Sequence, residues 1–148
     1  GRMKYQTIGP DKLNQLRHAR MFRTAEDVKK HMERHAEILR PKFESVLNEL
    51  EKELKDSGIA RWTTPKGGYF ISLWVLNGCA KRVVQLCANA GMILTPAGAP
   101  FPYGYDSEDS NIRIAPSYPS VEEIEKASKV LCTAVKYAAL EKLLSDNA

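Results

Sequence analysis

The feature that most constrains this fold is one apolar stripe that extends from Val28 to Leu54. Its members recur at alternating spacings of four and three residues, which places them on one face of a single long α-helix. The helix that this stripe predicts runs from about Thr24 to about Lys55 and spans about 45 Å, which is more than a small domain needs for its own core. Pro41 lies inside it and removes one backbone donor, so we expect a kink near residues 37–41. The stripe consists of Val28, Met32, His35 or Ala36, Leu39, Phe43, Val46, Leu50 and Leu54.

Capping residues mark where the helices begin. The pair Thr24–Asp27 is a weak variant of the capping box in front of the long helix. Asn77 is expected to cap a helix over Cys79–Ala90. Ser120 and Glu123 form an S-x-x-E capping box, which predicts that the last helix begins there. The side chains of this last helix that we expect to face the core are Ile124, Ala127, Leu131, Ala134, Val135 and Ala138.

Four short segments have the apolar composition of strands. They are 59–63, 69–76, 92–94 and 111–115, separated by helices and by turns rich in Pro and Gly. The segment 69–76 is apolar on both faces, so we expect it to be the central strand. The chain alternates strands and helices but is too short for a doubly wound domain. We therefore predict an α+β fold with a small, mainly antiparallel sheet of three or four strands covered by helices.

Arg113 is the polar residue in the middle of the last predicted strand. Side chains alternate between the two faces of a strand, so Ile112 and Ile114 share one face and Arg113 lies on the other. An arginine in this position can bind a carboxylate through two parallel hydrogen bonds. An ordinary solvent-facing arginine has the same pattern, so this segment alone leaves both interpretations open.

Two other functions have weaker support in the sequence. His31 and His35 share a helix face, as metal ligands do, but Glu33 points away from them and His18 is the only other histidine. We therefore expect no metal site. The net charge is +4, with +5 over residues 1–40 and −1 over the rest. The basic residues are scattered with little aromatic interleaving, so we expect no nucleic-acid partner.

The cysteines and the hydropathy pattern bear on the cellular location. Cys79, Cys87 and Cys132 are odd in number and lack C-x-x-C spacing, so we interpret them as reduced, buried thiols. No signal peptide and no apolar run long enough for a membrane span occur in the sequence. We expect a cytoplasmic protein with no membrane partner.

Several short motifs follow one another in a recognisable order. The segment Thr64-Pro65-Lys66-Gly67-Gly68-Tyr69-Phe70 leads into the central strand, and Ala90-Gly91-Met92-Ile93-Leu94-Thr95-Pro96-Ala97-Gly98 follows the next helix. Asn111-Ile112-Arg113-Ile114-Ala115 and Pro119-Ser120-Val121-Glu122-Glu123-Ile124 come after a loop rich in Pro, Gly and Tyr. This order resembles the C-terminal small domain of fold-type I pyridoxal-phosphate (PLP) aminotransferases, in their aspartate-aminotransferase-like branch. The resemblance covers the chain from about Ile8 onward.

The resemblance implies a function for the parent protein and a role for one residue. Arg113 matches the arginine that grips the substrate's α-carboxylate, and the loop Pro96–Tyr105 would line the entrance to the site. Nothing in this chain resembles the neighbourhood of the Schiff-base lysine, the aspartate of the pyridinium nitrogen or the phosphate cradle. Lys66 lies beside Gly67, but the family pattern gives it no Schiff-base role. In the family these parts belong to the large domain, which comes first in the chain.

We therefore expect a fragment that begins after the catalytic lysine, contains no catalytic residue and is inactive alone. PLP is expected in the full-length parent and not on this chain. The partners are then an amino acid or 2-oxo acid, the N-terminal PLP domain of the same protein and a second subunit of a homodimer. We divide the chain into a cloning remnant or truncated linker at 1–9, a helical segment at 10–56 and the small domain at 57–148.

One alternative remains open. The long stripe would also suit a non-catalytic interaction or ligand-sensing domain, such as the aminotransferase-like part of a regulator. The sequence does not discriminate between aspartate and alanine as the amino acid, and it leaves the residues that select the side chain open.

Overall fold

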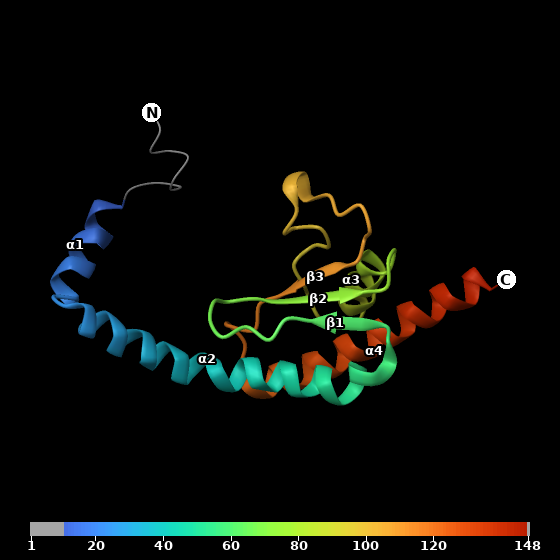
Figure 1. Ribbon diagram of the computed structural model, residues 1–148, viewed down its shortest axis with the longest axis horizontal. Coiled ribbons are helices and arrows are strands. Elements are labelled where there is room, and N and C mark those ends of the chain that lie inside the picture. The colour runs from blue at the N-terminus through green and yellow to red at the C-terminus, as the bar shows by residue number, and fades with distance from the viewer. Residues whose placement is uncertain (1–10, 148) are drawn as a thin grey trace. The chain divides into compact units, whose positions relative to one another are not determined.

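The structure is a computed structural model that describes residues 11–147. The predicted remnant at 1–9 lies outside these residues. The described chain forms two compact units, 11–38 and 39–147, and the boundary between them falls inside one helix. The elements, shown in Figure 1, are α1 (Lys12–Met21), α2 (Ala25–Leu54), β1 (Ala60–Trp62), β2 (Ile71–Val75), α3 (Ala80–Asn89), β3 (Asn111–Ile114) and α4 (Val121–Asp146).

The unit 11–38 contains α1 and the first half of α2. Asp11 caps α1, because its side chain accepts a hydrogen bond from the Asn14 N–H at 3.0 Å. Thr24 and Asp27 form the predicted capping box: the Thr24 hydroxyl accepts the Asp27 N–H and the Asp27 carboxylate accepts the Thr24 N–H. α2 then continues through Pro41 without a break in its helical assignment. The kink expected there stays a prediction.

The unit 39–147 is built on a three-stranded antiparallel sheet with the order β1-β2-β3. This confirms the predicted α+β class and the central position of β2. The segment 92–94 is not a strand, contrary to the sequence prediction. The Met92 N–H bonds instead to the Cys87 carbonyl at the end of α3, so it is unavailable to a strand ladder. Met92 and Leu94 pack against the core as irregular chain, and Ile93 is exposed.

The core lies on one face of the sheet. The buried side chains on this face are Ile71, Leu73 and Val75 of β2 and Ile112 and Ile114 of β3. The helices α2, α3 and α4 complete it with buried side chains. Figure 1 shows the last part of α2 and the first part of α4 running beside the sheet. The largest buried helical side chains are Leu50, Leu54, Val83, Cys87, Leu131, Cys132 and Val135.

Only the C-terminal half of the apolar stripe on α2 belongs to this core. Val46, Leu50 and Leu54 are buried, whereas Val28 is 40% exposed and Met32 is 65% exposed. The exposed half lies in the unit 11–38, where α1 contributes no buried residue. The same apolar periodicity therefore continues along the whole helix, although its side chains are exposed in the first half and buried in the second.

The capping residue of α3 differs from the sequence prediction. Asn77 was expected to cap this helix, but the N-cap position is Cys79, which makes no side-chain cap bond. Asp109 supplies the cap from the segment before β3: its carbonyl accepts the Ala80 N–H at 2.8 Å and its carboxylate accepts the Lys81 N–H at 3.1 Å. The box of Ser120 and Glu123 on α4 is formed as predicted.

Candidate functional site

The face of the sheet opposite the core is polar, and it carries Arg113. In the antiparallel register Ser72 lies opposite Arg113 and Trp74 lies opposite Asn111. These four residues alternate with the buried Ile71, Leu73, Ile112 and Ile114, so they share one surface. We call the surface formed by Ser72, Trp74, Asn111 and Arg113 the polar face.

The guanidinium of Arg113 lies against an aromatic ring and has no anionic partner among the residues that the structure describes. Its Cζ lies 4.5 Å from the centre of the Phe70 ring. Its Nε is buried and has no hydrogen-bond partner in the described chain. Within residues 11–147 no aspartate or glutamate forms an ion pair with Arg113. A partly buried cation with unpaired donors is suited to bind an anion, and its planar fork matches a carboxylate.

Asn111 is the buried polar residue of the polar face. Its side chain is 2% exposed, and its Oδ1 has no hydrogen-bond partner among the residues that the structure describes. Its backbone N–H, in contrast, donates to the Asp106 carboxylate at 2.9 Å. The strand that carries Arg113 is therefore fixed at its first residue through the backbone, while one side-chain acceptor stays unpaired.

Asp106 organises the segment that leads into β3. Its carboxylate accepts three backbone N–H groups, from Glu108 at 3.1 Å and from Ser110 and Asn111 at 2.9 Å each. Burial by itself raises the pKa of Asp106, but these hydrogen bonds favour the charged form more strongly and leave its pKa below the ordinary value. The Asp106 carboxylate thus sets where β3 begins.

The loop before Asp106 projects from the sheet (Figure 1, gold) and is closed by two glycines. Gly98 has φ +85°, and a Cβ on it would lie 2.4 Å from the Gly104 carbonyl oxygen, so only glycine fits. At the tip Tyr103 is fully exposed and has φ 58°. Close backbone packing therefore holds the base of this loop, while its aromatic tip is open to solvent.

The segment that follows β3 is tied to α2. The Lys42 ammonium donates to the Ser117 carbonyl at 2.8 Å and to the Tyr118 carbonyl at 3.3 Å. The strand carrying Arg113 is thus anchored on both sides, by Asp106 before it and by Lys42 after it.

The described residues do not fit the covalent attachment of PLP. A Schiff-base lysine must lie in a pocket that lowers its pKa. None of the lysines within 11–147 is buried, and Lys66 is exposed on its turn. The least exposed have other partners, Lys42 as above and Lys142 with Asp146. Among the described residues, Arg113 with its unpaired Nε is a group suited to bind an anion.

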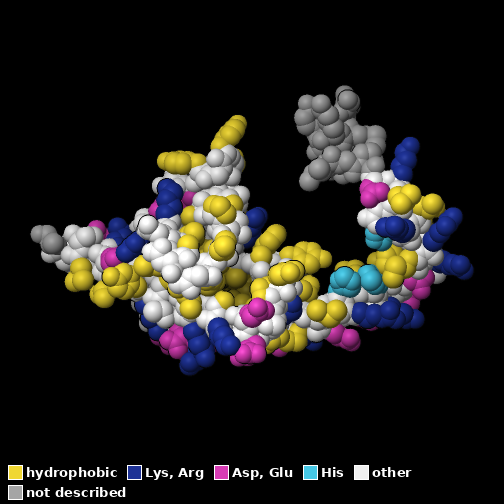
Figure 2. All heavy atoms as spheres, turned by 180° about the vertical axis from the view of Figure 1, so that it is seen from behind, with side chains coloured by type: hydrophobic (Ala, Val, Ile, Leu, Met, Phe, Trp, Pro, Cys, Tyr) yellow, Lys and Arg dark blue, Asp and Glu magenta, His cyan; other side chains and the backbone are white. Residues whose placement is uncertain are grey.

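The histidines gather near the start of α2, as Figure 2 shows in cyan. The rings of His31 and His35 are 4.5 Å apart between centroids, and Phe22 lies 5.0 Å from His31. The His18 ring is stacked with Phe22, at 5.8 Å between centroids. No group of three metal-ligating side chains occurs in the described part of the chain.

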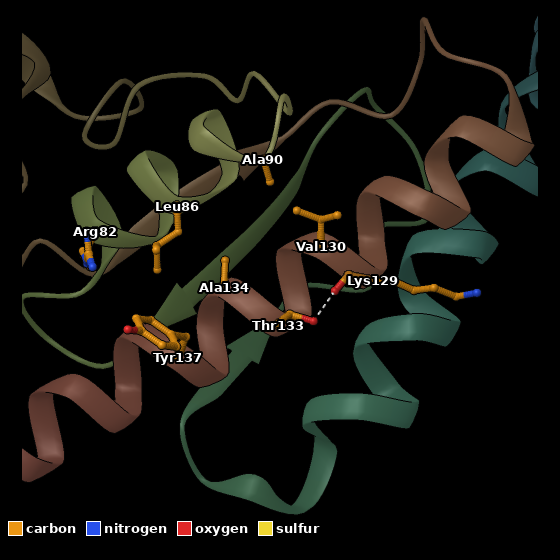
Figure 3. A pocket seen from close by; sticks show the side chains of 8 residues that line it. All are labelled: Arg82, Leu86, Ala90, Lys129, Val130, Thr133, Ala134 and Tyr137. Atoms are coloured by element: carbon orange, nitrogen blue, oxygen red, sulfur yellow. Dashed lines mark hydrogen bonds between the residues drawn. The ribbon is translucent and has the colours of Figure 1, made fainter.

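A separate groove of about 500 Å³ lies between α3 and α4 (Figure 3). Leu86 of α3 and Ala134 of α4 point toward one another across it, and Tyr137 and Arg82 lie at one end. The Arg82 guanidinium donates two hydrogen bonds to the Glu141 carboxylate, at 2.7 and 2.8 Å. No residue of the polar face lines this groove, so it is distinct from the surroundings of Arg113.

Sequence reasoning identified Arg113 but missed the residues that hold it. Phe70 lies directly before β2, and its contact with Arg113 depends on the register between β2 and β3. Asp106 does have a local signal in the sequence, because an aspartate in a loop often accepts a hydrogen bond from the backbone N–H two residues further on, as in an Asx turn.

None of the helices within 11–147 has the length and apolar character needed to cross a membrane.

Comparison with known proteins shows which protein family this chain resembles. A family model described as aspartate amino-transferase matches residues 2–147. A putative aminotransferase of Mycolicibacterium smegmatis is 52% identical over 142 residues, which cover 96% of this chain and 33% of that protein. The crystal structure of an aspartate transaminase from Corynebacterium glutamicum is 48% identical, with a TM-score of 0.86 over 96% of this chain and 34% of that one.

A more distant relative is named as a transcriptional regulator and not as an aminotransferase. An uncharacterized HTH-type transcriptional regulator of Bacillus subtilis is 30% identical over 139 residues, which cover 93% of this chain and 27% of that protein. The chain thus spans about a third of the length of the curated relatives it matches. The resemblance found in the sequence is confirmed, because the family model covers nearly the whole chain: it belongs to the aspartate aminotransferase family.

Proposed function

We propose that this chain is the C-terminal, substrate-clamping part of a PLP-dependent aminotransferase. The parent protein would transfer an amino group between an amino acid, such as aspartate or alanine, and a 2-oxo acid. Arg113 would bind the α-carboxylate of both. The observation that supports this role is the guanidinium on the polar face, partly buried, unpaired at Nε and without an ion pair among residues 11–147.

The geometry of a guanidinium explains what Arg113 contributes. Two parallel N–H groups bind the two oxygens of a carboxylate, which fixes the carboxylate plane as well as its position. The substrate then loses rotation about the bond between its carboxylate and Cα, so its Cα–H is presented in one direction. Orientation of this kind lowers the entropic part of the barrier.

The remaining machinery would come from outside residues 1–148. No lysine of the described chain is buried, so the N-terminal domain of the same protein would supply the Schiff-base lysine and hold PLP. The loop Pro96–Tyr105, held by Gly98, would line the entrance to the site. We place the full-length protein in the cytoplasm, which agrees with three buried free cysteines, and we propose that it is a homodimer.

The test compares two arginines on the same side of the sheet in the full-length protein. Arg113→Lys keeps the charge but removes the planar fork, so we expect kcat/KM for the amino acid to fall about 5- to 150-fold, or about 1–3 kcal/mol. Arg61 is stacked on Trp74 at 4.3 Å and is exposed, so Arg61→Lys is the matched control and should change kcat/KM less than about twofold. An unchanged kcat/KM in Arg113→Lys would contradict the proposal.

A second experiment locates the cofactor lysine. Borohydride reduction of the PLP-loaded full-length protein, followed by peptide mapping, should label one lysine outside residues 1–148. Stoichiometric labelling of a lysine within them, such as Lys66, would contradict the proposal that the N-terminal domain supplies the Schiff-base lysine.

Ligand sensing is the second candidate function, and the relative named as a transcriptional regulator supports it. A sensor would bind amino acids through Arg113 but would not turn them over. Steady-state release of a 2-oxo acid by the full-length protein supports the enzyme, whereas saturable amino-acid binding without release supports the sensor.

A further inference from the structure

We propose that Phe70 is the positioning residue for Arg113: its ring holds the guanidinium in place without neutralising it or occupying its hydrogen-bond donors. This inference rests on the proposed function of Arg113 as a carboxylate clamp. The geometry behind it is the 4.5 Å distance between the Arg113 Cζ and the centre of the Phe70 ring. A cation over an aromatic face at this distance is attracted by the negative face of the ring.

The choice of an aromatic partner has a specific consequence for binding. An aspartate or glutamate would also hold Arg113, but it would use the same N–H groups that a substrate carboxylate needs and would cancel their charge. A ring contacts the flat side of the guanidinium and leaves its edge free. No carboxylate of the described chain pairs with Arg113, and its Nε is unpaired, so the ring is the partner that the structure shows for it.

The backbone around Phe70 explains why its ring stays in position. The Thr63 N–H donates to the Ser72 carbonyl, and the Ser72 N–H donates to the Thr63 hydroxyl, both at 3.0 Å. These two bonds close the β1–β2 hairpin immediately beyond the loop that contains Phe70. Ser72 also lies opposite Arg113 in the sheet. The same residue therefore closes the base of the loop and lies beside the arginine in the sheet.

The surroundings of Phe70 separate this role from that of a core residue. Its side chain is 48% exposed and it does not belong to the buried cluster on the other face of the sheet. An aromatic residue with half its surface in water contributes little to the core, so its replacement should leave the fold intact. The effect of replacement should then appear in carboxylate binding.

The experiment uses the full-length protein and two substitutions at the same position. Phe70→Leu removes the aromatic face but keeps an apolar side chain, whereas Phe70→Tyr keeps the face. The probe is propionate as a competitive inhibitor, because its single carboxylate is the charged group that Arg113 would bind and it carries no amine or second carboxylate. We expect Phe70→Leu to raise its inhibition constant about 3- to 30-fold and the KM values for amino acid and 2-oxo acid similarly, with kcat changing less. Phe70→Tyr should stay within about twofold of the unsubstituted protein.

Tyr137→Leu is the matched control, since it removes an aromatic ring of similar exposure, 51%, from α4, where Tyr137 lines the separate groove and lies outside the polar face. It should leave the propionate inhibition constant unchanged. Arg113→Lys separates the two proposals: if it leaves propionate binding and kcat/KM unchanged, the clamp function itself fails. If Arg113→Lys weakens propionate binding but Phe70→Leu does not, the positioning role of Phe70 is wrong. Equal losses in Phe70→Leu and Phe70→Tyr would also overturn it, because the tyrosine retains the ring.

Discussion

Asp109 caps helix α3 from a position 28 residues away, with its Oδ1 accepting the Lys81 N–H at 3.1 Å. The same residue accepts the Ala80 N–H through its carbonyl, so two of the orphan donors of α3 are satisfied by the segment in front of β3. The helix and the strand that carries Arg113 are therefore linked at their starting points.

This link predicts a measurable loss of stability. Asp109→Ala should lower the free energy of unfolding by about 0.5–2 kcal/mol, because a helix donor loses its acceptor. Asp109 has φ 46°, a conformation that asparagine adopts readily, so Asp109→Asn should lose less. Urea unfolding of the chain provides the measurement, and Glu125→Ala on the exposed side of α4 is the control. An Asp109→Ala variant that is as stable as the unsubstituted chain would show that the side-chain cap contributes nothing.

Gly98 of the projecting loop and Gly67 of the turn before β2 predict a contrast between similar substitutions. Gly98→Ala places a Cβ 2.4 Å from a backbone oxygen at a positive φ, so it should destabilise the chain by about 1–3 kcal/mol. Gly67→Ala adds the same methyl group where no atom lies within 4 Å, and we expect a change below about 0.5 kcal/mol. Thermal unfolding of both variants checks this, and a tolerated Gly98→Ala would mean that the loop base is not closely packed.

The Asp106 carboxylate predicts a dependence of stability on pH. Its pKa is lower in the folded chain than its ordinary value of 3.8, so the charged form contributes stability above that value. The contribution is lost as the pH falls through the lowered pKa of the folded state. Asp106→Asn should therefore flatten the decline in unfolding free energy between about pH 4 and pH 2. Denaturant unfolding over this range measures the decline, and an unchanged slope would rule out Asp106 as its source.

The apolar stripe on α2 predicts different responses from its two halves. Leu50 is fully buried, so Leu50→Ala should cost about 2–5 kcal/mol of unfolding free energy. Met32 belongs to the same stripe but is 65% exposed, and Met32→Ala should change stability by less than about 0.5 kcal/mol. Urea unfolding compares the two. Similar losses would mean that both halves contribute to one core.

The candidate site was only partly predictable from the sequence. The alternation around Arg113 placed it on the face away from the core, because that rule needs no more than neighbouring residues. Its partners required the register between strands. Arg113 and Ser72 lie opposite each other only in the folded sheet, and Phe70 reaches the guanidinium through that pairing.

The sequence by itself determined the elements whose hydrogen bonds close within a few residues. The capping boxes of Thr24 with Asp27 and of Ser120 with Glu123 span three residues, so the chain needs no other partner to form them. Only the tertiary structure decided that Asp109 rather than Asn77 caps α3, that residues 92–94 are irregular and that the stripe on α2 is buried from Val46 onward. These outcomes depend on contacts between residues far apart in the chain, and a local sequence pattern does not say which distant residue will make the contact.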